Sequence, residues 1–387
     1  MNILCVVQRF GERIIGGAEF HCRLIAERLA EHHNVEVATT CADNYLTWKN
    51  VYPEGMAEEN GLRIYRFPVE RFRNESFDLL AFRVLHDYSS HSEQMVYLES
   101  HGPFTPKLIS FLKERTDIDR FIFFSYRYWN TYMGLQAVGH KSILVPTAEH
   151  DRTLYLDIHR ETFNRPAAIA FNSVEECDLI RHVSGNAKVP GIVVGVGLPD
   201  ILDTAIDDVL TKHDITEPYF LYLGRIEDSK GCSTLIEYYL RCFEILRNLP
   251  LLVFVGKQEI NVPDHSRIRI LGILSETDKQ ALLKSALALI MPSPYESLSM
   301  VLLEAWRESK AVLCNGKCEV LRGQCRRSNG GLYYRNFDEF FEALSLMLHR
   351  SDISDLLGNQ GNAYYQKEYN WSTIMSKYEY LLTLDVS

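Results

Sequence analysis

Short apolar segments alternate with helical patterns along this chain, and its beginning shows the repeating unit. Residues 2–7 form an apolar run, followed by a glycine-bearing polar loop at 9–17. Residues 18–31 carry apolar side chains at helical spacing, and residues 35–40 alternate as a strand does. This order predicts a βαβ unit, which implies a parallel sheet with right-handed crossovers.

The same rhythm continues in two series, separated by a polar stretch at 200–216. Residues 74–115 interrupt the first series with mixed aromatic, His, Pro and charged residues, which predicts helical pieces joined by a mobile loop on the acceptor side. The further strands that we predict are 62–67, 121–125, 142–146, 167–171 and 191–199, then 219–224, 251–255, 268–271, 286–291 and 311–314, with helices at 278–285, 301–309 and 371–382.

Two α/β series predict two Rossmann-like, doubly wound domains that face each other across a ligand cleft at the carboxyl ends of their sheets. We place the crossing between residues 196 and 216. The first domain is expected to comprise residues 1–198 with a C-terminal helix at 371–387, and the second residues 199–370.

Composition narrows the class of protein. Of 387 residues, 46% are hydrophobic and 24% charged, as in globular proteins, and the net charge of −10 argues against a general nucleic-acid binder. We find no apolar stretch long enough to span a bilayer, and residues 1–7 are expected to form a strand and not a signal peptide. Nine cysteines among apolar neighbours suit a reducing compartment. We therefore expect a cytoplasmic protein, with peripheral contact at the inner face of the membrane left open.

Two clusters of side chains have competing interpretations. Cys314, Cys318 and Cys325 lie close in sequence but lack a Cys-x-x-Cys pair and a fourth ligand, so no metal is predicted. Arg66, Arg71 and Arg73 are expected either to meet an anionic acceptor or membrane surface, or to form a solvated basic face.

Candidate chemistry begins after the strand at 219–224. Arg225 and Lys230 stand in a loop that starts at Gly224 and ends at Gly231, where a helix opens. Both cations would lie at the carboxyl edge of the sheet, where Arg can grip a phosphate with two donors and Lys adds a point charge. The alternative is a loop with solvated cations.

A second candidate segment follows the strand at 286–291. Glu296 and Glu304 stand eight positions apart, so both side chains can lie near one face of a helix and its leading loop if that helix starts near Ser297. The helix N-terminus would then offer N–H groups to a phosphate, and the carboxylates would take sugar hydroxyls. Arg225 and Lys230 would lie at the same site if the strands at 219–224 and 286–291 are near neighbours in the sheet. An ordinary amphipathic helix with solvated glutamates is the alternative.

Together these motifs resemble the retaining glycosyltransferases of family 4, which have the GT-B fold. Gly16, Gly17 and Glu19 are similar to the N-terminal glycine motif of that family. His150 follows a strand where the family keeps a His near the transferred sugar, and Trp371 begins a helix like the one that returns to the N-terminal domain. The resemblance covers nearly the whole chain and is weakest over residues 74–115.

The resemblance implies a role for each matched residue. Arg225 and Lys230 would neutralise the donor diphosphate, Glu296 would bind sugar hydroxyls, and Glu304 would accept hydrogen bonds from the ribose hydroxyls. His150 would contact the transferred sugar or take part in catalysis, with Glu149 and Asp151 as its rivals. Further contacts implied are Gly16, Gly17, Ser299, Met300 and Val301 with the diphosphate, Leu298 with the sugar, and Gly272, Ile273 and Leu274 with the base.

One departure and one open choice remain. Many members have glycine where this chain has Ser299, which adds a hydroxyl to the pocket. The aromatic run Tyr126, Arg127, Tyr128 and Trp129 is either a wall on which the acceptor sugar stacks or the start of a buried helix.

The expected activity is transfer of a hexose from a nucleotide diphosphate sugar to a hydroxyl of a saccharide or lipid-linked acceptor, with retention, in surface polysaccharide synthesis. UDP-glucose is favoured as donor because it is common in the family. The expected enzyme needs no cofactor. The alternatives are a two-Rossmann nucleotide-sugar epimerase or hydrolase, and a sugar-nucleotide-binding protein without turnover.

Overall fold

The computed structural model describes residues 1–14, 16–73, 76–200, 205–246 and 248–384. The chain divides into two compact units. The first comprises Met1–Gly197 with Trp371–Ser387, and the second comprises Leu198–Asn370. The chain thus leaves the first unit one residue before the predicted boundary at 198 and comes back at the predicted residue, 371.

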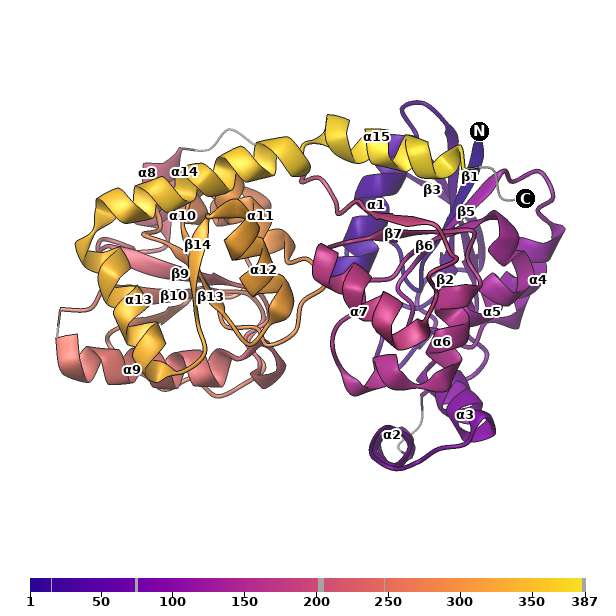
Figure 1. The fold of residues 1–387 in the computed structure, drawn as a ribbon, viewed down its shortest axis with the longest axis horizontal. Coiled ribbons are helices and arrows are strands. Elements are labelled where there is room, and N and C mark those ends of the chain that lie inside the picture. Colours follow the sequence, from indigo (N-terminus) through magenta and orange to yellow (C-terminus); the bar gives the residue numbers. More distant parts are fainter. Residues whose placement is uncertain (15, 74–75, 201–204, 247, 385–387) are drawn as a thin grey trace. The chain divides into compact units, whose positions relative to one another are not determined.

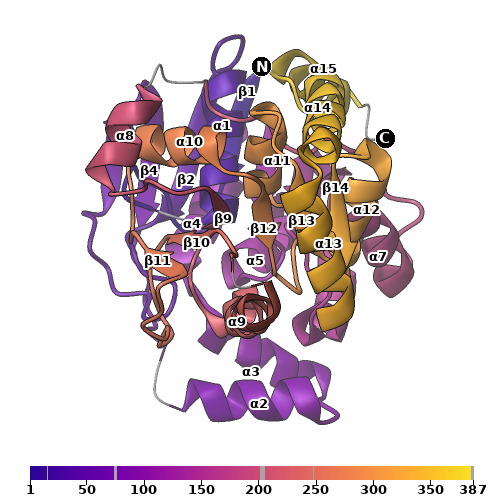
Figure 2. The ribbon, with the colours of Figure 1, turned by 90° about the vertical axis from the view of Figure 1, so that its left-hand side faces the viewer.

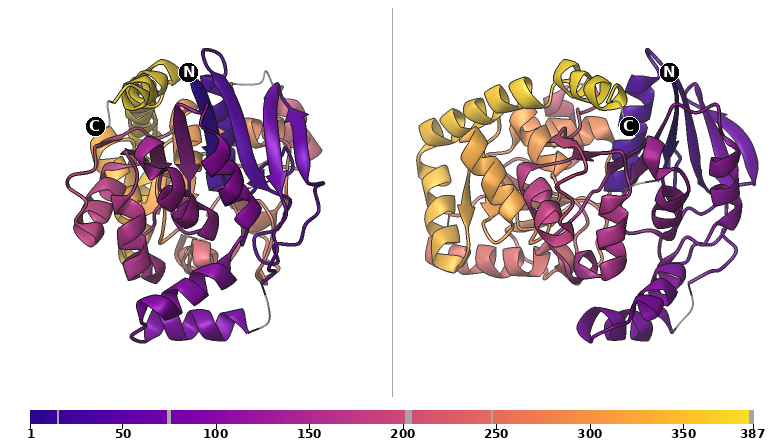
Figure 3. Two further views of the ribbon diagram at one scale, coloured as in Figure 1. Left: turned by 90° about the vertical axis from the view of Figure 1, so that its right-hand side faces the viewer. Right: turned by 45° about the vertical axis from the view of Figure 1, so that its right-hand side comes forward.

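The first unit is an α/β unit with a largely parallel sheet (Figures 1 and 3). Its strands are β1 (Asn2–Val6), β2 (Asn34–Thr40), β3 (Gly55–Glu59), β4 (Leu62–Phe67), β5 (Arg120–Phe124), β6 (Ser142–Val145), β7 (Ala168–Phe171) and β8 (Gly191–Val193). Its α-helices are α1 (Gly17–Leu29), α2 (Phe77–His86), α3 (His91–His101), α4 (Pro106–Glu114), α5 (Trp129–Val138), α6 (Asp157–Asn164), α7 (Val174–Ser184) and α15 (Trp371–Leu382).

Strand order in the first sheet is β3-β4-β2-β1-β5-β6-β7-β8. Parallel strands covered on both faces are apolar almost throughout, which explains why they read as continuous apolar runs. Along β1, Leu4 and Val6 join a core cluster that includes Leu112 of α4 and Leu135 of α5. Cys5, between them, lies beside Cys22 of α1. Alternate side chains of β1 therefore pack against helices on opposite faces of the sheet.

The predicted insertion at 74–115 is helical in its described part. Helix α3 starts with a capping box, in which the Ser90 hydroxyl accepts from the Glu93 backbone N–H and the Glu93 carboxylate accepts from that of Ser90. Helices α2 and α3 pack against each other at one end of the first unit (Figure 3). Along the chain, α2, α3 and α4 lie between β4 and β5.

Helix α15 belongs to the first unit although it ends the chain. Its Ile374, Tyr378 and Leu381 are buried, which is the face that the helical spacing predicts. The Arg28 guanidinium of α1 lies over the Trp371 ring, 4.9 Å from its centroid. Figure 1 shows α15 after α14 in yellow.

The second unit contains a second doubly wound parallel sheet with its helices (Figure 2). Its strands are β9 (Tyr219–Leu223), β10 (Leu251–Val255), β11 (Ile268–Ile270), β12 (Leu289–Met291), β13 (Val312–Asn315) and β14 (Gly331–Tyr334), in the order β11-β10-β9-β12-β13-β14. Its α-helices are α8 (Ile206–Lys212), α9 (Cys232–Leu246), α10 (Glu276–Ser285), α11 (Met300–Arg307), α12 (Glu319–Ser328), α13 (Phe337–His349) and α14 (Ser351–Glu368).

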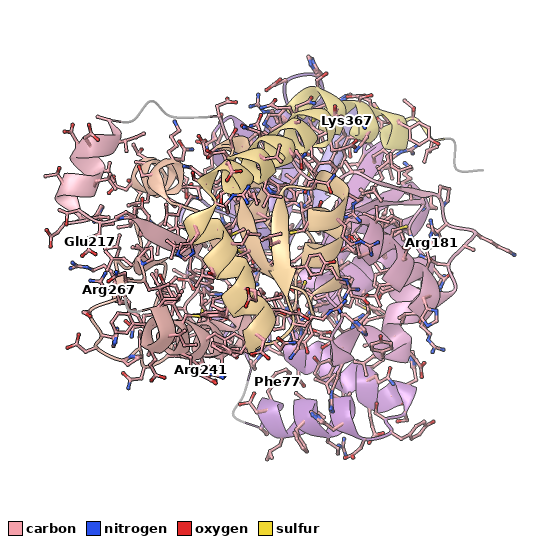
Figure 4. The ribbon with its side chains drawn as sticks, turned by 60° about the vertical axis from the view of Figure 1, so that its left-hand side comes forward. Phe77, Arg181, Glu217, Arg241, Arg267 and Lys367 are labelled. Carbon is pink, nitrogen blue, oxygen red and sulfur yellow. The ribbon has the colours of Figure 1, made fainter. Side chains whose placement is uncertain are left out.

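The order of the second sheet reverses direction between β9 and β12, which makes their carboxyl ends its topological switch point. At the opposite end of β10 and β11, the Arg267 guanidinium donates to the Leu249 carbonyl at 3.2 Å and to Glu217 at 2.8 Å. Figure 4 labels Arg267 and Glu217.

Two strands and one helix start differ from the sequence-based expectation. Strand β3 is antiparallel to β4 and lies at an edge of its sheet, where it carries charges and lacks an apolar run. Strand β14, which we did not predict, lies at an edge of the second sheet and is parallel to β13. Helix α11 begins at Met300, one residue before the predicted helix at 301–309 and three residues after the alternative start near Ser297. Among the described residues, no helix is both long and apolar enough to cross a membrane.

Candidate functional site

The loops after β9 and β12 meet at the switch point of the second sheet. Leu289 of β12 pairs in register with Leu221 of β9, so the two strands are direct neighbours. Lys230 Nζ donates to Glu296 Oε1 at 2.8 Å. Residues 66 positions apart in the chain are thereby joined in one ion pair.

Close packing of the two loops depends on Gly231, which follows Lys230. Its φ is +77°, and a Cβ there would stand 2.4 Å from the Pro292 carbonyl oxygen. Only glycine combines this left-handed backbone with so close an approach. The Lys-Gly pair therefore has a structural reason: the glycine lets the first loop pack on the second, and the lysine next to it reaches Glu296.

Arg225 lies in the same loop and has its own acidic neighbour. Its Nη1 is 2.8 Å from Glu227 Oε2, and 48% of its side chain is exposed. Lys230 is less open, with 25% of its side chain exposed. Both predicted cations are thus at the carboxyl edge of the sheet, each beside a carboxylate.

Helix α11 starts on a strained residue. Ser299, its N-cap, has φ +69° and ψ 91°, and its side chain makes no capping bond. Because the helix begins at Met300, Glu296 lies in the loop and Glu304 lies in the second turn. The helix start is three residues later than Ser297, and the two carboxylates lie on successive segments, the leading loop and the helix.

Glu304 is buried and is held by a lysine that the sequence pattern did not single out. Lys279 Nζ of α10 lies 3.0 Å from Glu304 Oε1 and 2.6 Å from Glu276. Burial raises the pKa of Glu304, and Lys279 opposes that rise. Within the described residues, Glu304 Oε2 and Ser299 Oγ are buried without a hydrogen-bond partner. Lys279 belongs to no motif, and only the packing of α10 beside Glu304 reveals it.

The loop after β11 and the residue before Ser299 complete the predicted donor contacts. Gly272 has φ +71°, and its carbonyl oxygen accepts from the Gly256 N–H at 2.8 Å. Ile273 is exposed. Leu298, in contrast, is buried, and its contact with the sugar stays a prediction.

In the first unit, the glycine motif lies after β1, next to β5 and therefore at that sheet's switch point. Gly16 is the N-cap of α1. A Cβ on Gly16 would stand 2.1 Å from the Glu19 carboxylate, whereas one on Gly17 would meet no atom within 4 Å. Glu19 is buried against Arg9, whose Nε donates to its Oε1 at 2.8 Å. Gly16 therefore makes room for this ion pair, and Gly17 is the glycine with open space beside it.

His150 follows β6 in an exposed position. Its Nε2 lies 2.6 Å from the Tyr155 hydroxyl. On both sides of His150 in the sequence, Glu149 and Asp151 accept hydrogen bonds from the Arg127 guanidinium, the Glu149 bond measuring 3.2 Å. The two predicted rivals of His150 thus share one arginine, and the histidine side chain points outward from the loop.

The residues of the aromatic run after β5 differ in burial, so the two predicted alternatives are judged residue by residue. Tyr126 is buried, and its ring packs 4.7 Å from that of His159, centroid to centroid. Trp129 is also buried and starts α5. The acceptor-wall prediction is therefore wrong for Tyr126, because its ring belongs to the core. Tyr128 is half-buried and stacks on His101 at 5.3 Å.

The basic-face interpretation also needs a correction, because Arg66 is buried and donates to the Phe10 carbonyl at 3.1 Å. Among the residues that the structure describes, no three His, Cys, Asp or Glu side chains gather as a metal ion would require.

Comparison with known proteins places this geometry in a class. Solved structures that match over nearly the whole length include sucrose-phosphate synthase from Thermosynechococcus elongatus (TM-score 0.71, 16% identity, 98% of each chain covered). HepE from Anabaena in complex with UDP and glucose has a TM-score of 0.72 at 14% identity, with 99% of each chain covered. WaaG, a glycosyltransferase involved in lipopolysaccharide biosynthesis, has a TM-score of 0.68 at 15% identity and covers 99% of this chain. The fold is that of the GT-B glycosyltransferases.

A family model matches part of the second unit. Residues 207–363 are similar to the family described as glycosyl transferases group 1. That range contains Arg225, Lys230, Lys279, Glu296 and Glu304. No curated protein sequence matches the chain.

Proposed function

We propose that this protein is a retaining glycosyltransferase that moves a hexose from a nucleoside diphosphate sugar to a hydroxyl of a saccharide or lipid-linked acceptor. The observation that supports it best is the group of buried polar atoms at the start of α11. Glu304 Oε2 and Ser299 Oγ lack partners within the described residues, and the first N–H groups of α11 have no partner inside the helix. A buried polar atom without a hydrogen-bond partner lowers the stability of the fold, unless a ligand provides that partner.

The proposed donor contacts follow from the charges of the second unit. The two ribose hydroxyls donate to Glu304, whose other oxygen is held by Lys279. The diphosphate lies against the first N–H groups of α11, at Met300 and Val301, and against Arg225 and Lys230. Glu296, released from Lys230 when the diphosphate takes that lysine, accepts hydroxyls of the hexose.

In the proposed reaction, the bond between the anomeric carbon and the diphosphate oxygen breaks while the acceptor oxygen attacks from the same face. Positive charge develops on the sugar ring, and negative charge develops on the diphosphate. Arg225, Lys230 and the helix N-terminus stabilise that negative charge electrostatically. The leaving phosphate oxygen takes the proton of the acceptor hydroxyl, so the step needs no protein nucleophile.

UDP-glucose is the proposed donor and surface polysaccharide synthesis the proposed pathway. Support for the donor comes from HepE, which was solved with UDP-glucose, and from a trehalose-6-phosphate enzyme of E. coli, which was solved with UDP-2-fluoro glucose. His150 of the first unit is proposed to contact the transferred hexose.

Donor binding and turnover are tested separately. A thermal-shift panel of nucleoside diphosphates and their glucose, galactose and mannose conjugates should show a stabilising donor, because a ligand of the folded state raises the melting temperature. Glu304→Gln should weaken nucleoside diphosphate binding at least about tenfold, the loss expected for a hydrogen bond to a charged group. Glu276→Gln, which changes the exposed partner of Lys279, is the matched control.

Release of nucleoside diphosphate from the stabilising donor, with and without sugar acceptors, then separates the alternatives. Release that depends on an acceptor supports transfer. Acceptor-independent release, or a changed sugar still bound to the nucleotide, would favour a hydrolase or an epimerase. Tight binding without release from any donor would favour a binding protein without turnover.

A further inference from the structure

Glu176, outside every motif used above, is a buried carboxylate that joins two strand ends of the first unit. It stands in the first turn of α7, where its backbone N–H donates to the Ser173 hydroxyl at 3.1 Å. Its Oε1 accepts from the Ala148 N–H and its Oε2 from the Asn172 N–H, both at 2.5 Å. Asn172 Nδ2 adds a third bond to Oε1, at 3.3 Å.

These bonds tie together the carboxyl ends of neighbouring strands. Ala148 follows β6 and Asn172 follows β7, and the two strands pair in parallel through Ile143 and Ala168. In a helix with a Ser cap, an acidic residue at this position commonly turns back to the cap's own N–H. Glu176 accepts instead from the N–H of Asn172, one residue before the cap, and from that of Ala148 in the loop after β6. Its role is therefore not explained by the stability of α7 alone.

Glu176 is a buried carboxyl group, and both of its oxygens accept N–H bonds. Either oxygen keeps a lone pair for such a bond when the group carries a proton. Burial raises the pKa of Glu176 to about 8, while the bonds from Asn172 and Ala148 oppose that rise and the charge of Glu149 adds to it. Burial of a polar group costs free energy. Glu176 offsets that cost with hydrogen bonds to Ala148 and Asn172, which an apolar residue could not make.

What Glu176 holds is the loop that carries His150. Thr147, next to Ala148, has φ +51°, a left-handed conformation that a β-branched residue rarely adopts. Beyond Ala148, Glu149 and Asp151 bind Arg127, and the His150 ring faces outward to the Tyr155 hydroxyl. The loop is thus fixed from inside at Ala148 by Glu176 and from its flank by Arg127.

We propose that Glu176 is a positioning residue for His150: by holding the Ala148 and Asn172 N–H groups it sets the loop that presents the histidine to the transferred sugar. The role of His150 rests on the proposed function. Glu176 itself touches neither substrate nor reacting atoms, so its effect on turnover runs through the loop.

Glu176→Gln tests this proposal, because the amide keeps the shape but turns one acceptor into a donor that faces a backbone N–H. We expect turnover to fall about tenfold to a hundredfold, while nucleoside diphosphate affinity, a property of the second unit, stays within twofold. Ser173→Ala is the matched control: it removes the helix cap and about 1 kcal/mol of stability but leaves both loop bonds in place. It should keep parental turnover at temperatures well below unfolding.

A double-variant cycle with His150→Ala separates positioning from general loss of structure. If Glu176 acts through His150, the double variant should be no slower than His150→Ala alone. Independent, multiplicative losses, or parental turnover in Glu176→Gln, would overturn the proposal.

Amide hydrogen exchange gives a readout that needs no turnover. The Ala148 amide should be protected in the parent and should exchange at least about tenfold faster in Glu176→Gln, and the His150 ring signals should shift in NMR spectra. Failure of the proposed function would appear as no nucleoside diphosphate release by the parent protein. Failure of the Glu176 proposal would appear as unchanged exchange at Ala148 and unchanged His150 signals, whatever the activity.

Discussion

At the scale of single residues, each glutamate of the candidate site already holds a lysine: Lys230 lies 2.8 Å from Glu296, and Lys279 lies 3.0 Å from Glu304. The two pairs differ in their surroundings. Glu304 is buried with one oxygen unpartnered within the described chain, whereas 14% of the Glu296 side chain is exposed. A diphosphate that takes Lys230 must compete with Glu296, and a ribose that takes Glu304 need not displace Lys279.

Glu296→Ala should therefore separate binding from transfer. Removal of the carboxylate takes away one acidic partner of Lys230 that competes with the diphosphate. Nucleoside diphosphate affinity should therefore stay level or tighten by a few-fold, as expected for a partly exposed ion pair of about 1 kcal/mol. Transfer should fall at least about a hundredfold because the hexose loses its carboxylate partner. Calorimetric titration with the nucleotide and initial rates of transfer measure the two effects.

Glu227→Ala, which removes one acidic partner of Arg225 without changing the proposed hexose contact, is the control for that experiment. It should leave transfer within a few-fold of the parent. A fall in nucleotide affinity as large as the fall in transfer would contradict the separate roles of Glu296 and Glu304.

At the scale of elements, the site depends on where helices begin and how they are held. Helix α11 starts on Ser299 at a positive φ, and α10 is tied to α8 through one carboxylate. Both features lie near the candidate residues Glu304 and Lys279. Each feature allows a test by measurement of the free energy of unfolding.

Ser299→Gly should stabilise the protein by about 1 kcal/mol, since glycine adopts a positive φ without strain and the change removes a buried hydroxyl without a partner in the described chain. The N–H groups of α11 stay in place, but a hydroxyl proposed to meet the donor is lost, so donor affinity should fall a few-fold. Denaturant unfolding measures the gain. A loss of stability would show that the Ser299 hydroxyl has a structural role.

Asp278→Asn should change the acid sensitivity of the second unit. Lys212 Nζ and His213 Nε2 of the α8 end lie 2.7 and 2.9 Å from Asp278 Oδ2 and lower the pKa of that carboxyl from 3.8 to about 2. A lowered folded-state pKa contributes stability that is present above pH 4 and is lost as the pH falls toward 2. The variant should lose about 1 kcal/mol at pH 6 and about nothing below pH 2.

Free energies of unfolding at several pH values between 2 and 6 check that expectation, with Lys212→Met as a second variant that removes one of the two partners. A difference between parent and Asp278→Asn that stays constant over this range would contradict the assignment to ionisation of Asp278.

At the scale of the whole molecule, the chain passes from the first unit to the second after Gly197 and returns at Trp371. These two residues touch within the first unit. A Cβ on Gly197 would stand 2.6 Å from the Trp371 ring. The contact fixes the beginning of α15 beside the segment at which the chain first leaves the unit.

Gly197→Ala should therefore destabilise the first unit by about 2 kcal/mol, because the added methyl group forces the Trp371 ring or the backbone to move. In a Trp371→Ala background the same change should have little effect, since the space is then free. Denaturant unfolding of the four proteins measures the coupling. An equal loss in both backgrounds would place the strain elsewhere than at Trp371.

The sequence by itself determined the α/β class, most strand positions and the group Arg225, Lys230, Glu296 and Glu304. Buried parallel strands have to be apolar along their length, and residues that share one loop or one helix start keep a readable spacing. Only the tertiary structure decided that Lys279 holds Glu304, that Tyr126 and Leu298 are buried, and that Glu176 grips Ala148. Those pairings join elements far apart in the chain, and packing, which leaves no local pattern, sets them.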